Sequence, residues 1–302
     1  MRSAVPFVMG QVMHTYRHSG LTVASELALP EWEGFACASG KADVRILYGK
    51  GNREWPPEDE VAVDSGTLRF AIDGVGGWEV AGGHTIRVFP EPRAGETELR
   101  LFTLGSAWGA LGIQRGLAFW HGSAVTRGGR TIFICGPQGA GKSTLAAALV
   151  GHGWELLADD LARIEPREDG ALIYPSSQRS KLWSDAVAYL DLSERVLHRD
   201  YFRADKFHCG MQAAAHDKTT LTAIVLLVEG DAPRIERLSG ADAMTEAFTA
   251  ALYRPQYVEA LAAWLAQTVL AARICATTPV YRLLRPHALD RLDESCALID
   301  GW

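Results

Sequence analysis

Cysteine is scarce in this sequence of 302 residues, and the few cysteines form no pattern. They are Cys37, Cys135, Cys209, Cys275 and Cys296, an odd number with no C-x-x-C pair and no Cys/His spacing of the kind that holds zinc. This usage argues against a disulfide-stapled secreted fold and predicts no zinc site. It is typical of a protein in a reducing cytoplasm.

Long apolar runs and runs of basic residues are missing as well. No stretch reaches the ~18 apolar residues that cross a bilayer, and the segment 261–276 contains Gln267 and Arg273. Residues 1–17 are apolar only briefly and lack a clear cleavage site. The net charge is −6, so the positive footprint of a nucleic-acid-binding protein is absent. We therefore expect a cytoplasmic location, no membrane contact and no nucleic-acid partner.

The composition contains enough hydrophobic residues for a globular core. Hydrophobic residues make up 48% and charged residues 22% of the chain, which is ordinary for a folded protein, and the length suggests two domains. Residues 1–100 contain short β-prone segments separated by Gly, Pro and Asp, at 21–23, 44–47, 61–63, 68–72 and 85–88. We expect a β-rich N-terminal domain over residues 1–100 that positions an acceptor or mediates assembly.

From residue 101 to residue 302, strands alternate with helices, which predicts an α/β domain. The expected strands are 123–125 and 131–135, joined as a hairpin, then 154–158, the apolar run 221–228, and 280–284. A second hairpin is expected from 163–165 and 171–174. The expected helices are 99–115, 143–150, 239–252, 255–272 and 290–299, with Ser239 as a cap and Pro255 as a first residue.

The sequence GPQGAGKS at 136–143 satisfies the phosphate-loop motif G-x-x-x-x-G-K-[ST] in full, between an apolar strand and an Ala/Leu-rich helix. Its glycines let backbone N–H groups turn toward an anion, and the helix N-terminus adds partial positive charge. Lys142 is expected to reach the β- and γ-phosphates of ATP, and Ser143 to ligate Mg²⁺. The predicted nucleotide contacts are Gly136, Pro137, Gln138, Gly139, Ala140, Gly141, Lys142, Ser143 and Thr144.

Two adjacent aspartates, Asp159 and Asp160, follow the strand predicted over 154–158. Neighbouring carboxylates repel each other unless a cation, or a hydroxyl that needs a base, uses their charge. The plainer alternative is a solvated turn in which one aspartate caps the next element. His121 precedes Gly122 at the entry to the first hairpin, and alone it is as compatible with a structural role as with a functional one.

Taken together, three segments resemble the catalytic domain of the HPr kinase/phosphorylase family. They are HGSAV at 121–125, the loop at 136–143 and LADD at 157–160, with His121 21 residues before Lys142 and Asp160 18 residues after it. The close resemblance covers residues 118–166. It implies a P-loop kinase fold related to phosphoenolpyruvate carboxykinase. It also implies that Asp160 is the base for a seryl hydroxyl, that His121 assists near the reacting phosphate, and that Asp159 holds Mg²⁺ through water.

Two departures from that family narrow the resemblance. The family's second signature stretch, which supplies a further metal-binding Glu, cannot be placed in this sequence, and this argues against a phosphorylase activity. Segments 16–30, 42–46, 174–176 and 182–185 instead resemble the HPr-kinase-like kinases of lasso-peptide biosynthesis. That resemblance implies a serine acceptor in a ribosomal precursor peptide.

A basic group follows the nucleotide-binding segment and consists of Arg179, Lys181, Arg203 and Lys206. A kinase needs cations to offset the charge that develops on the transferred phosphoryl group. Either one of these residues makes that contact, or all four are solvated loop charges. Trp183, at the start of a predicted amphipathic helix, is expected to pack against other side chains.

We therefore expect Mg²⁺-dependent transfer of the ATP γ-phosphoryl group to a serine of a peptide or protein, with Asp160, His121 and Lys142 as catalytic residues and Ser143 and Asp159 as metal ligands. Three alternatives stay open: a small-molecule or amino-acid kinase, a bifunctional HPr kinase/phosphorylase, and an ATP-binding regulatory module. The family resemblance is compatible with a homo-oligomer.

Overall fold

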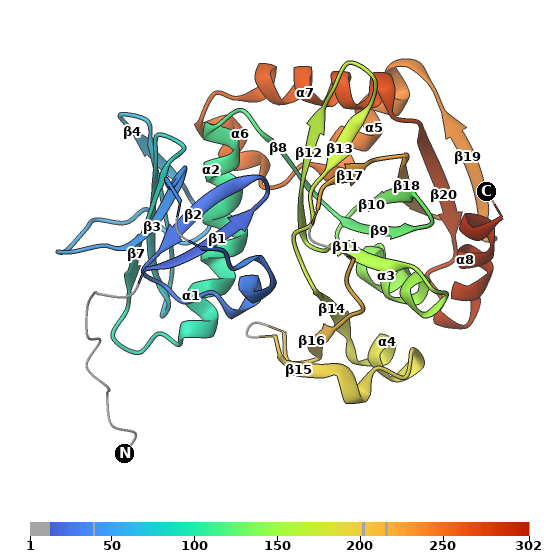
Figure 1. The fold of residues 1–302 in the computed structure, drawn as a ribbon, viewed down its shortest axis with the longest axis horizontal. Helices are drawn as coiled ribbons and strands as arrows, with labels where there is room; N and C mark the ends of the chain where they lie inside the picture. Colours follow the sequence, from blue (N-terminus) through green and yellow to red (C-terminus); the bar gives the residue numbers. More distant parts are fainter. Residues whose placement is uncertain (1–12, 39, 201–202, 215–216, 302) are drawn as a thin grey trace. The chain divides into compact units, whose positions relative to one another are not determined.

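The computed structural model describes residues 13–38, 40–200, 203–214 and 217–301. The chain divides into two units, Met1–Leu111 and Gly112–Trp302 (Figure 1). The division predicted at residue 100 falls within a helix, α1 (Glu96–Phe102).

The first unit is built on a seven-stranded sheet in the order β1-β2-β3-β7-β6-β5-β4. Its strands are β1 (His14–His18), β2 (Leu21–Ser25), β3 (Val44–Tyr48), β4 (Ala62–Asp64), β5 (Thr67–Ile72), β6 (Gly76–Ala81) and β7 (Thr85–Pro90). β2, β3, β4, β5 and β7 lie on the predicted segments. β6 was missed because it begins with two glycines, which are poor strand formers.

Helical turns cover one part of this unit. A 3₁₀ helix, η1 (Pro30–Phe35), follows β2, and after β7 come α1, a π-helical turn η2 (Thr103–Ala107) and α2 (Trp108–Gln114). The helix predicted at 99–115 is therefore present but begins at Glu96 and is interrupted by the π turn. Trp78 is fully buried and donates its indole N–H to Thr103 Oγ1 at 2.9 Å, which attaches the turn to β6.

The second unit contains a six-stranded sheet in the order β11-β9-β10-β18-β20-β19. The strands are β9 (Ser123–Arg127), β10 (Arg130–Cys135), β11 (Glu155–Ala158), β18 (Ala223–Glu229), β19 (Arg234–Leu238) and β20 (Val280–Arg285). β10, β18 and β20 are parallel, and the hairpin predicted from β9 and β10 is confirmed. The carboxyl ends of the three parallel strands therefore lie at one edge.

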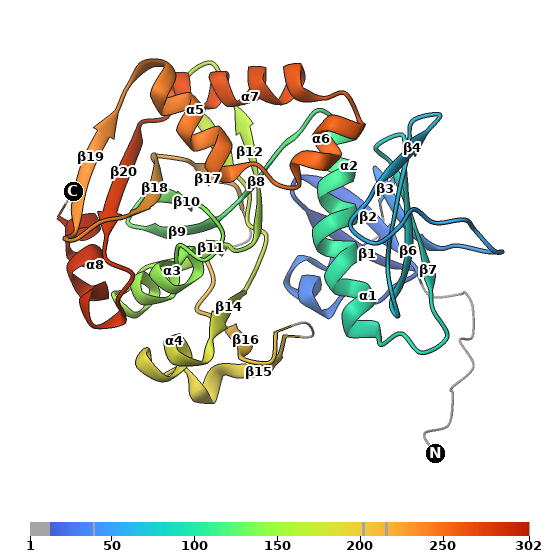
Figure 2. The same cartoon turned by 180° about the vertical axis from the view of Figure 1, so that it is seen from behind.

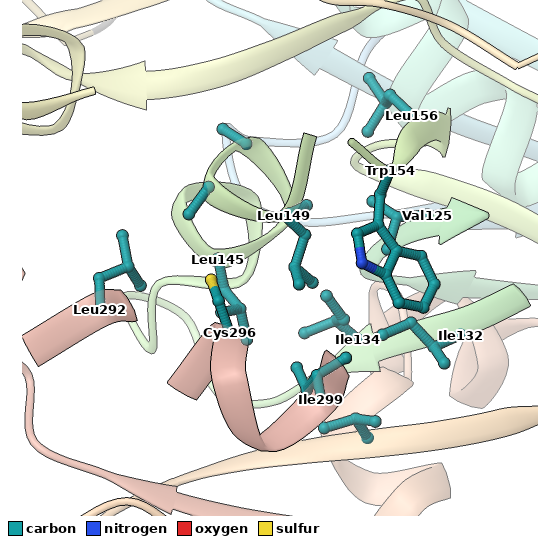
Figure 3. Close-up of a cluster of buried hydrophobic side chains, with 14 of the residues drawn as sticks. Val125, Ile132, Ile134, Leu145, Leu149, Trp154, Leu156, Leu292, Cys296 and Ile299 are labelled. Carbon is teal, nitrogen blue, oxygen red and sulfur yellow. The ribbon is translucent and has the colours of Figure 1, made fainter. Parts of the chain in front are cut away.

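Helices cover both faces of this sheet, because alternate residues of its central strands are apolar on both sides. On β10, Ile132 and Ile134 pack with α3 (Lys142–Gly151) and α8 (Leu292–Asp300), as Figure 3 shows. Phe133 and Cys135 pack on the opposite face with α5 (Gly240–Ala251) and α7 (Trp264–Thr277). Figure 2 shows this layering from behind.

Two smaller sheets flank the central one. The first, in the order β17-β13-β12-β8, contains β8 (Ala118–His121), β12 (Leu161–Pro166), β13 (Ala171–Ile173) and β17 (Thr219–Thr220), and its β12–β13 pair confirms the second predicted hairpin. The second, in the order β14-β16-β15, contains β14 (Arg179–Trp183), β15 (Val196–Arg199) and β16 (Lys206–Gly210). Short helical segments complete the unit: α4 (Ser184–Tyr189), η3 (Ser193–Arg195), α6 (Pro255–Ala260) and η4 (Leu289–Arg291).

Two helix predictions need correction. The single helix expected over 255–272 is two helices, α6 and α7, because Ala262 between them has φ 50°, a left-handed conformation that ends a right-handed helix. Ser239 stands at the N-cap position of α5 with extended backbone, but its side chain makes no capping hydrogen bond.

Across the described residues, no helix combines the length and the apolar character needed to cross a membrane.

Candidate functional site

The predicted phosphate loop connects β10 to α3. Its central glycines, Gly139 and Gly141, have φ of 86° and 84°. A Cβ at Gly139 would meet no atom within 4 Å, so the backbone conformation rather than space requires glycine there. α3 begins directly after the loop, with Gly141 at its N-cap position, and its unpaired N–H groups therefore lie beside the loop. This local structure suits an anion.

Lys142 lies along the loop. Its Nζ donates hydrogen bonds to the carbonyl oxygens of Gly136 at 2.9 Å and Pro137 at 3.0 Å. The side chain is buried, and this burial lowers the pKa of its ammonium, although Asp159 and Asp160 act in the opposite direction. The lysine therefore belongs to the same electrostatic cluster as the two aspartates.

Asp159 is held by three donors. Its Oδ1 accepts hydrogen bonds from Ser143 Oγ at 2.9 Å and Ser123 Oγ at 2.6 Å, and its Oδ2 accepts one from the backbone N–H of Lys181 at 3.1 Å. Only 6% of Asp159 is exposed. The structure thus brings together the two residues predicted to hold the metal.

The donor set of Ser143 and Asp159 fits Mg²⁺. A hydroxyl and a carboxylate are hard oxygen donors, and in kinases the remaining ligands of Mg²⁺ come from phosphates and water. In the part of the chain that the structure describes, no three His, Cys, Asp or Glu side chains gather to form a metal cage. Ser143 and Asp159 are therefore the residues that would hold the ion.

Asp160, between β11 and β12, has a left-handed backbone with φ 72°. Such a conformation is uncommon in residues other than glycine, although aspartate adopts it more readily than most. Its Oδ2 accepts a hydrogen bond from Lys181 Nζ at 2.6 Å, and its Oδ1 lies 3.5 Å from His121 Nδ1. The carboxyl group remains partly open to solvent, with 36% of the side chain exposed.

Asp160 and Lys181 each favour the charged form of the other. Burial alone would raise the pKa of Asp160, but Lys181 and His121 outweigh it and hold that pKa well below its usual range. Burial alone would lower the pKa of Lys181, but Asp160 outweighs it and the pKa is raised. At neutral pH Asp160 is therefore a carboxylate and Lys181 an ammonium.

His121 ends β8, which pairs with β12 so that His121 is opposite Leu161. Its Nδ1 donates a hydrogen bond to the backbone carbonyl of Asp160 at 2.7 Å. Burial lowers its pKa, with a smaller opposing effect from Asp160. The ring is therefore neutral at pH 7, and with Nδ1 protonated the lone pair is on Nε2.

The close packing around Gly122 explains why a glycine follows this histidine. A Cβ at this position would lie 2.4 Å from the carbonyl oxygen of Ile134 and 2.5 Å from the ring of Phe133 on the neighbouring strand β10. Its backbone N–H donates to the carbonyl oxygen of Asp160 at 3.3 Å. The close approach lets the chain pass from β8 into β9 while His121 stays beside Asp160.

Further cations surround Asp160. Lys206 on β16 interacts electrostatically with both aspartates, and burial together with repulsion from Lys181 lowers its pKa. Arg254, with φ 50°, also interacts with Asp160, and the aromatic ring of Tyr253 lies 5.9 Å from that of His121. The aspartates thus lie among several positive side chains, which is the arrangement that stabilises a phosphoryl group in transfer.

A pocket of about 280 Å³ lies beside the phosphate loop, at the carboxyl ends of β18 and β20. It is lined by Pro137, Gln138, Gly139, Ala140, Leu227, Val228, Glu229, Arg285, Pro286 and His287. Arg285 is 5% exposed, and its Nη1 donates to the carbonyl of Ala140 at 3.4 Å. Its buried Nε has no hydrogen-bond partner among the described residues, so this guanidinium has donor capacity to spare.

The predicted residues fall into two groups. His121, Lys142, Ser143, Asp159 and Asp160 form one connected cluster, and the loop residues Pro137, Gln138, Gly139 and Ala140 line the pocket. Thr144 is buried within α3. Of the basic residues, Lys181 contacts Asp160 directly, whereas Arg203 is exposed near Trp183. Trp183, predicted to pack at the start of a helix, ends β14 and packs only in part: Lys206 and Arg203 lie near its ring, and 43% of it is exposed.

Several residues of the site were missed. Ser123 was quoted within HGSAV but given no role, although its hydroxyl holds Asp159. Tyr253 and Arg254 lie between α5 and α6, and Arg285 ends β20, so each reaches the site only through the tertiary fold. No local motif marks them. The left-handed backbone of Arg254 gives no signal in the sequence either, because arginine does not favour that conformation.

Comparisons with known proteins found matches among solved structures only. No protein-family model matches the sequence, and no curated protein matches it. Among solved structures, the Hpr(Ser) kinase/phosphatase from Coxiella burnetii matches with 12% identity and a TM-score of 0.34, covering 61% of this chain and 95% of that chain. An overlap of this quality does not transfer the activity of that protein to this chain.

Proposed function

We propose that this protein is a Mg²⁺-dependent kinase that transfers the γ-phosphoryl group of ATP to a serine hydroxyl of a peptide or protein. The observation that carries the proposal is the contact of Asp160 with Lys181 and His121, one residue from the Ser143–Asp159 pair. A metal-ligand pair and a separate, partly open carboxylate are the two acidic elements that phosphoryl transfer to a hydroxyl needs.

In this proposal the phosphate loop and Lys142 bind the phosphates of ATP, and Ser143 and Asp159 hold the metal. When bound, Mg²⁺ supplies positive charge to the nucleotide phosphates. The three donors to Asp159 fix its carboxylate, so that it does not have to reorganise when the nucleotide arrives.

Asp160 orients the acceptor hydroxyl. The seryl oxygen attacks the γ-phosphorus, the bond from phosphorus to the β–γ bridging oxygen breaks, ADP leaves, and the hydroxyl proton passes to Asp160. A carboxylate whose pKa is held low by Lys181 is a weak base. It is sufficient here, because a loose transition state is stabilised mainly by positioning and by charge rather than by a strong base.

Lys181 and His121 have different tasks. The ammonium of Lys181 keeps Asp160 ionised and adds positive charge where the phosphoryl group passes. His121 is neutral and fixes the backbone of Asp160 through its Nδ1–H, which leaves Nε2 as an acceptor of hydrogen bonds. An ATP-binding regulatory module needs no base for an acceptor, so a second carboxylate beside the metal pair favours the kinase.

The nucleoside of ATP fits the pocket beside the loop. Ser143 and Asp159 lie toward β9 and β11, whereas the pocket lies toward β18 and β20, on the other side of β10. Phosphates bound at the loop would leave the nucleoside on that side, at the carboxyl ends of parallel strands where ligands of α/β sheets bind. The buried guanidinium of Arg285 and the imidazole of His287 supply polar contacts there.

For the acceptor we propose a ribosomal precursor peptide of the lasso type. The support is the sequence resemblance of segments 16–30, 42–46, 174–176 and 182–185 to kinases of that pathway. The test is incubation with γ-labelled ATP, Mg²⁺ and serine-bearing lasso precursor peptides, including any encoded by neighbouring genes, followed by phosphoamino-acid analysis. Label on serine, absent from a Ser→Ala peptide, is expected. Label on free amino acids or small molecules alone would favour the small-molecule kinase instead.

A further inference from the structure

One face of the sheet β14–β16–β15 carries basic and aromatic side chains. In the antiparallel register Lys181 is opposite His208, and Trp183 is opposite Lys206. Directly opposed residues share a face, and residues two apart on a strand share it too. We call this surface the basic sheet face; it comprises Arg179, Lys181, Trp183, His198, Lys206 and His208.

The other face of the same sheet belongs to the core. Ser180, Leu182 and Cys209 are fully buried, and Leu182 and Cys209 share a hydrophobic cluster with α3. The basic sheet face is therefore the side turned away from the core. Its Trp183 is 43% exposed, so a large aromatic side chain is open to solvent on this face.

Trp183 lies between two cations. Lys206 Nζ is 5.6 Å and the guanidinium carbon of Arg203 is 5.9 Å from the centre of its ring. Lys206 and Arg203 repel each other, and Lys181 repels Lys206 as well, which together with burial lowers the pKa of Lys206. Positive charges held close together against repulsion indicate a surface that recognises negative charge.

Acidic residues near this surface offset part of its charge, and both Asp159 and Asp160 interact electrostatically with Lys206. Asp160 is paired with Lys181, and Asp200 lies 3.4 Å from His208. Asp205, which is exposed, directly precedes Lys206. Lys206 and the guanidinium of Arg203, the two cations beside Trp183, form no ion pair among the described residues, so they are the ones open to an acidic group.

We propose that the basic sheet face docks an acidic segment of the acceptor peptide, with Trp183 stacking on an apolar or amide group of that segment. This inference rests on the proposed kinase function and names the substrate class of the same site. The surface is continuous with the catalytic cluster through Lys181, which contacts Asp160.

The geometry also sets the spacing. Trp183 is two residues beyond Lys181 on β14, or ~7 Å along the strand. At ~3.3 Å per residue an extended peptide covers this distance in about two residues, and a peptide whose serine lies at Asp160 must also span the length of the Lys181 side chain, which adds about one or two more. The acidic residues of the acceptor are therefore expected two to four positions from the serine.

The experiment compares serine peptides that differ only at those positions, carrying Glu, Gln or Lys. We expect kcat/KM to be about 10- to 100-fold higher for the Glu peptide than for the Gln peptide, mainly through KM, with a preference that shrinks at 0.5 M salt. Lys206→Glu should invert the order, so that the Lys peptide becomes the better substrate. Trp183→Ala should raise KM for the Glu peptide about 10-fold.

Matched controls come from the same unit. Lys218→Glu changes an exposed lysine beside β17, and Trp264→Ala removes a 38%-exposed tryptophan on α7. Both should keep the parental preference for the Glu peptide. Equal kcat/KM for Glu and Gln peptides, or an unchanged order in Lys206→Glu, would overturn the proposal. So would a Lys206→Glu variant in which only the KM for ATP changes, because the cation would then serve the nucleotide.

A measurement of peptide binding tests this inference separately from the kinase function. Fluorescence anisotropy of the labelled Glu peptide on the full chain, without ATP, should show tighter binding than the Gln peptide, and Lys206→Glu should remove the difference. If the Glu peptide binds in this way but no serine peptide is ever phosphorylated, the kinase function is wrong and the docking surface stands. If serine is phosphorylated without a preference for the Glu peptide, the kinase function stands and the docking surface is wrong.

Discussion

The Nζ of Lys181, on β14, lies 2.6 Å from the Oδ2 of Asp160, in the turn between β11 and β12, although these strands belong to other sheets of the second unit. Lys181 also gives its backbone N–H to Asp159. One residue of β14 thus contacts both aspartates, Asp159 through its backbone and Asp160 through its side chain. In the proposed mechanism, these contacts help to separate a metal-holding Asp159 from an acceptor-orienting Asp160.

Replacement of Lys181 tests its effect on Asp160. In Lys181→Gln the ammonium that lowers the pKa of Asp160 is gone, so that pKa should rise and the acidic limb of the pH profile of kcat/KM should move to higher pH. Transfer at pH 7 should fall on the order of 10²-fold, as for the loss of one group that stabilises transition-state charge. Lys218→Gln is the control. An unshifted acidic limb in Lys181→Gln would show that Asp160 does not titrate in catalysis.

Lys142→Ala should abolish phosphoryl transfer and weaken ATP binding while the fold survives. The side chain lies along the loop, and its interactions there are hydrogen bonds to the carbonyls of Gly136 and Pro137. Isothermal titration with ATP and circular dichroism give the two readouts. Parental turnover in a folded Lys142→Ala protein would contradict the assignment of the phosphate site.

Asp159→Asn should act through the metal. The amide keeps the size of the side chain but removes the charge that, with Ser143, favours Mg²⁺. The Mg²⁺ concentration for half-maximal activity should rise, and added Mg²⁺ should partly restore transfer. Ser123→Ala, which removes only a donor to Asp159, should show a smaller shift in the same direction. A loss of activity that no Mg²⁺ concentration relieves would assign Asp159 another role.

His121 makes the free energy of unfolding depend on pH. Its pKa is lowered in the folded protein, so between that pKa and the unfolded value of about 6.5 the unfolded chain binds more protons. The free energy of unfolding should therefore fall as the pH decreases from 7.5 to 5. In His121→Gln this contribution is absent, so Tm should decrease less over the same range, while His208, whose pKa is also lowered, still contributes. An identical decrease of Tm in both proteins would be the contrary result.

The sequence predicted the parts of this fold whose signals are local. The loop at 136–143, its flanking strand and helix, and the two hairpins follow from glycine placement and apolar runs. The predicted helix at 255–272 failed because the left-handed turn at Ala262 leaves no mark in an Ala/Leu-rich segment. The basic cluster was visible in the sequence, but which member contacts Asp160 depends on the pairing of β14 with β16. Arg254 and Arg285 reach the site only through long-range packing.

The most direct test of the account is single-turnover transfer from labelled ATP to a serine peptide by Asp160→Asn, with ATP affinity measured separately. Asparagine preserves the size of the side chain and removes the carboxylate that orients the hydroxyl and takes its proton. We predict near-normal ATP affinity and a transfer rate lowered by about 10²–10⁴-fold. Transfer at the parental rate would contradict the central claim that Asp160 acts on the acceptor serine. Loss of ATP binding together with transfer would contradict it too, because Asp160 would then be a metal ligand.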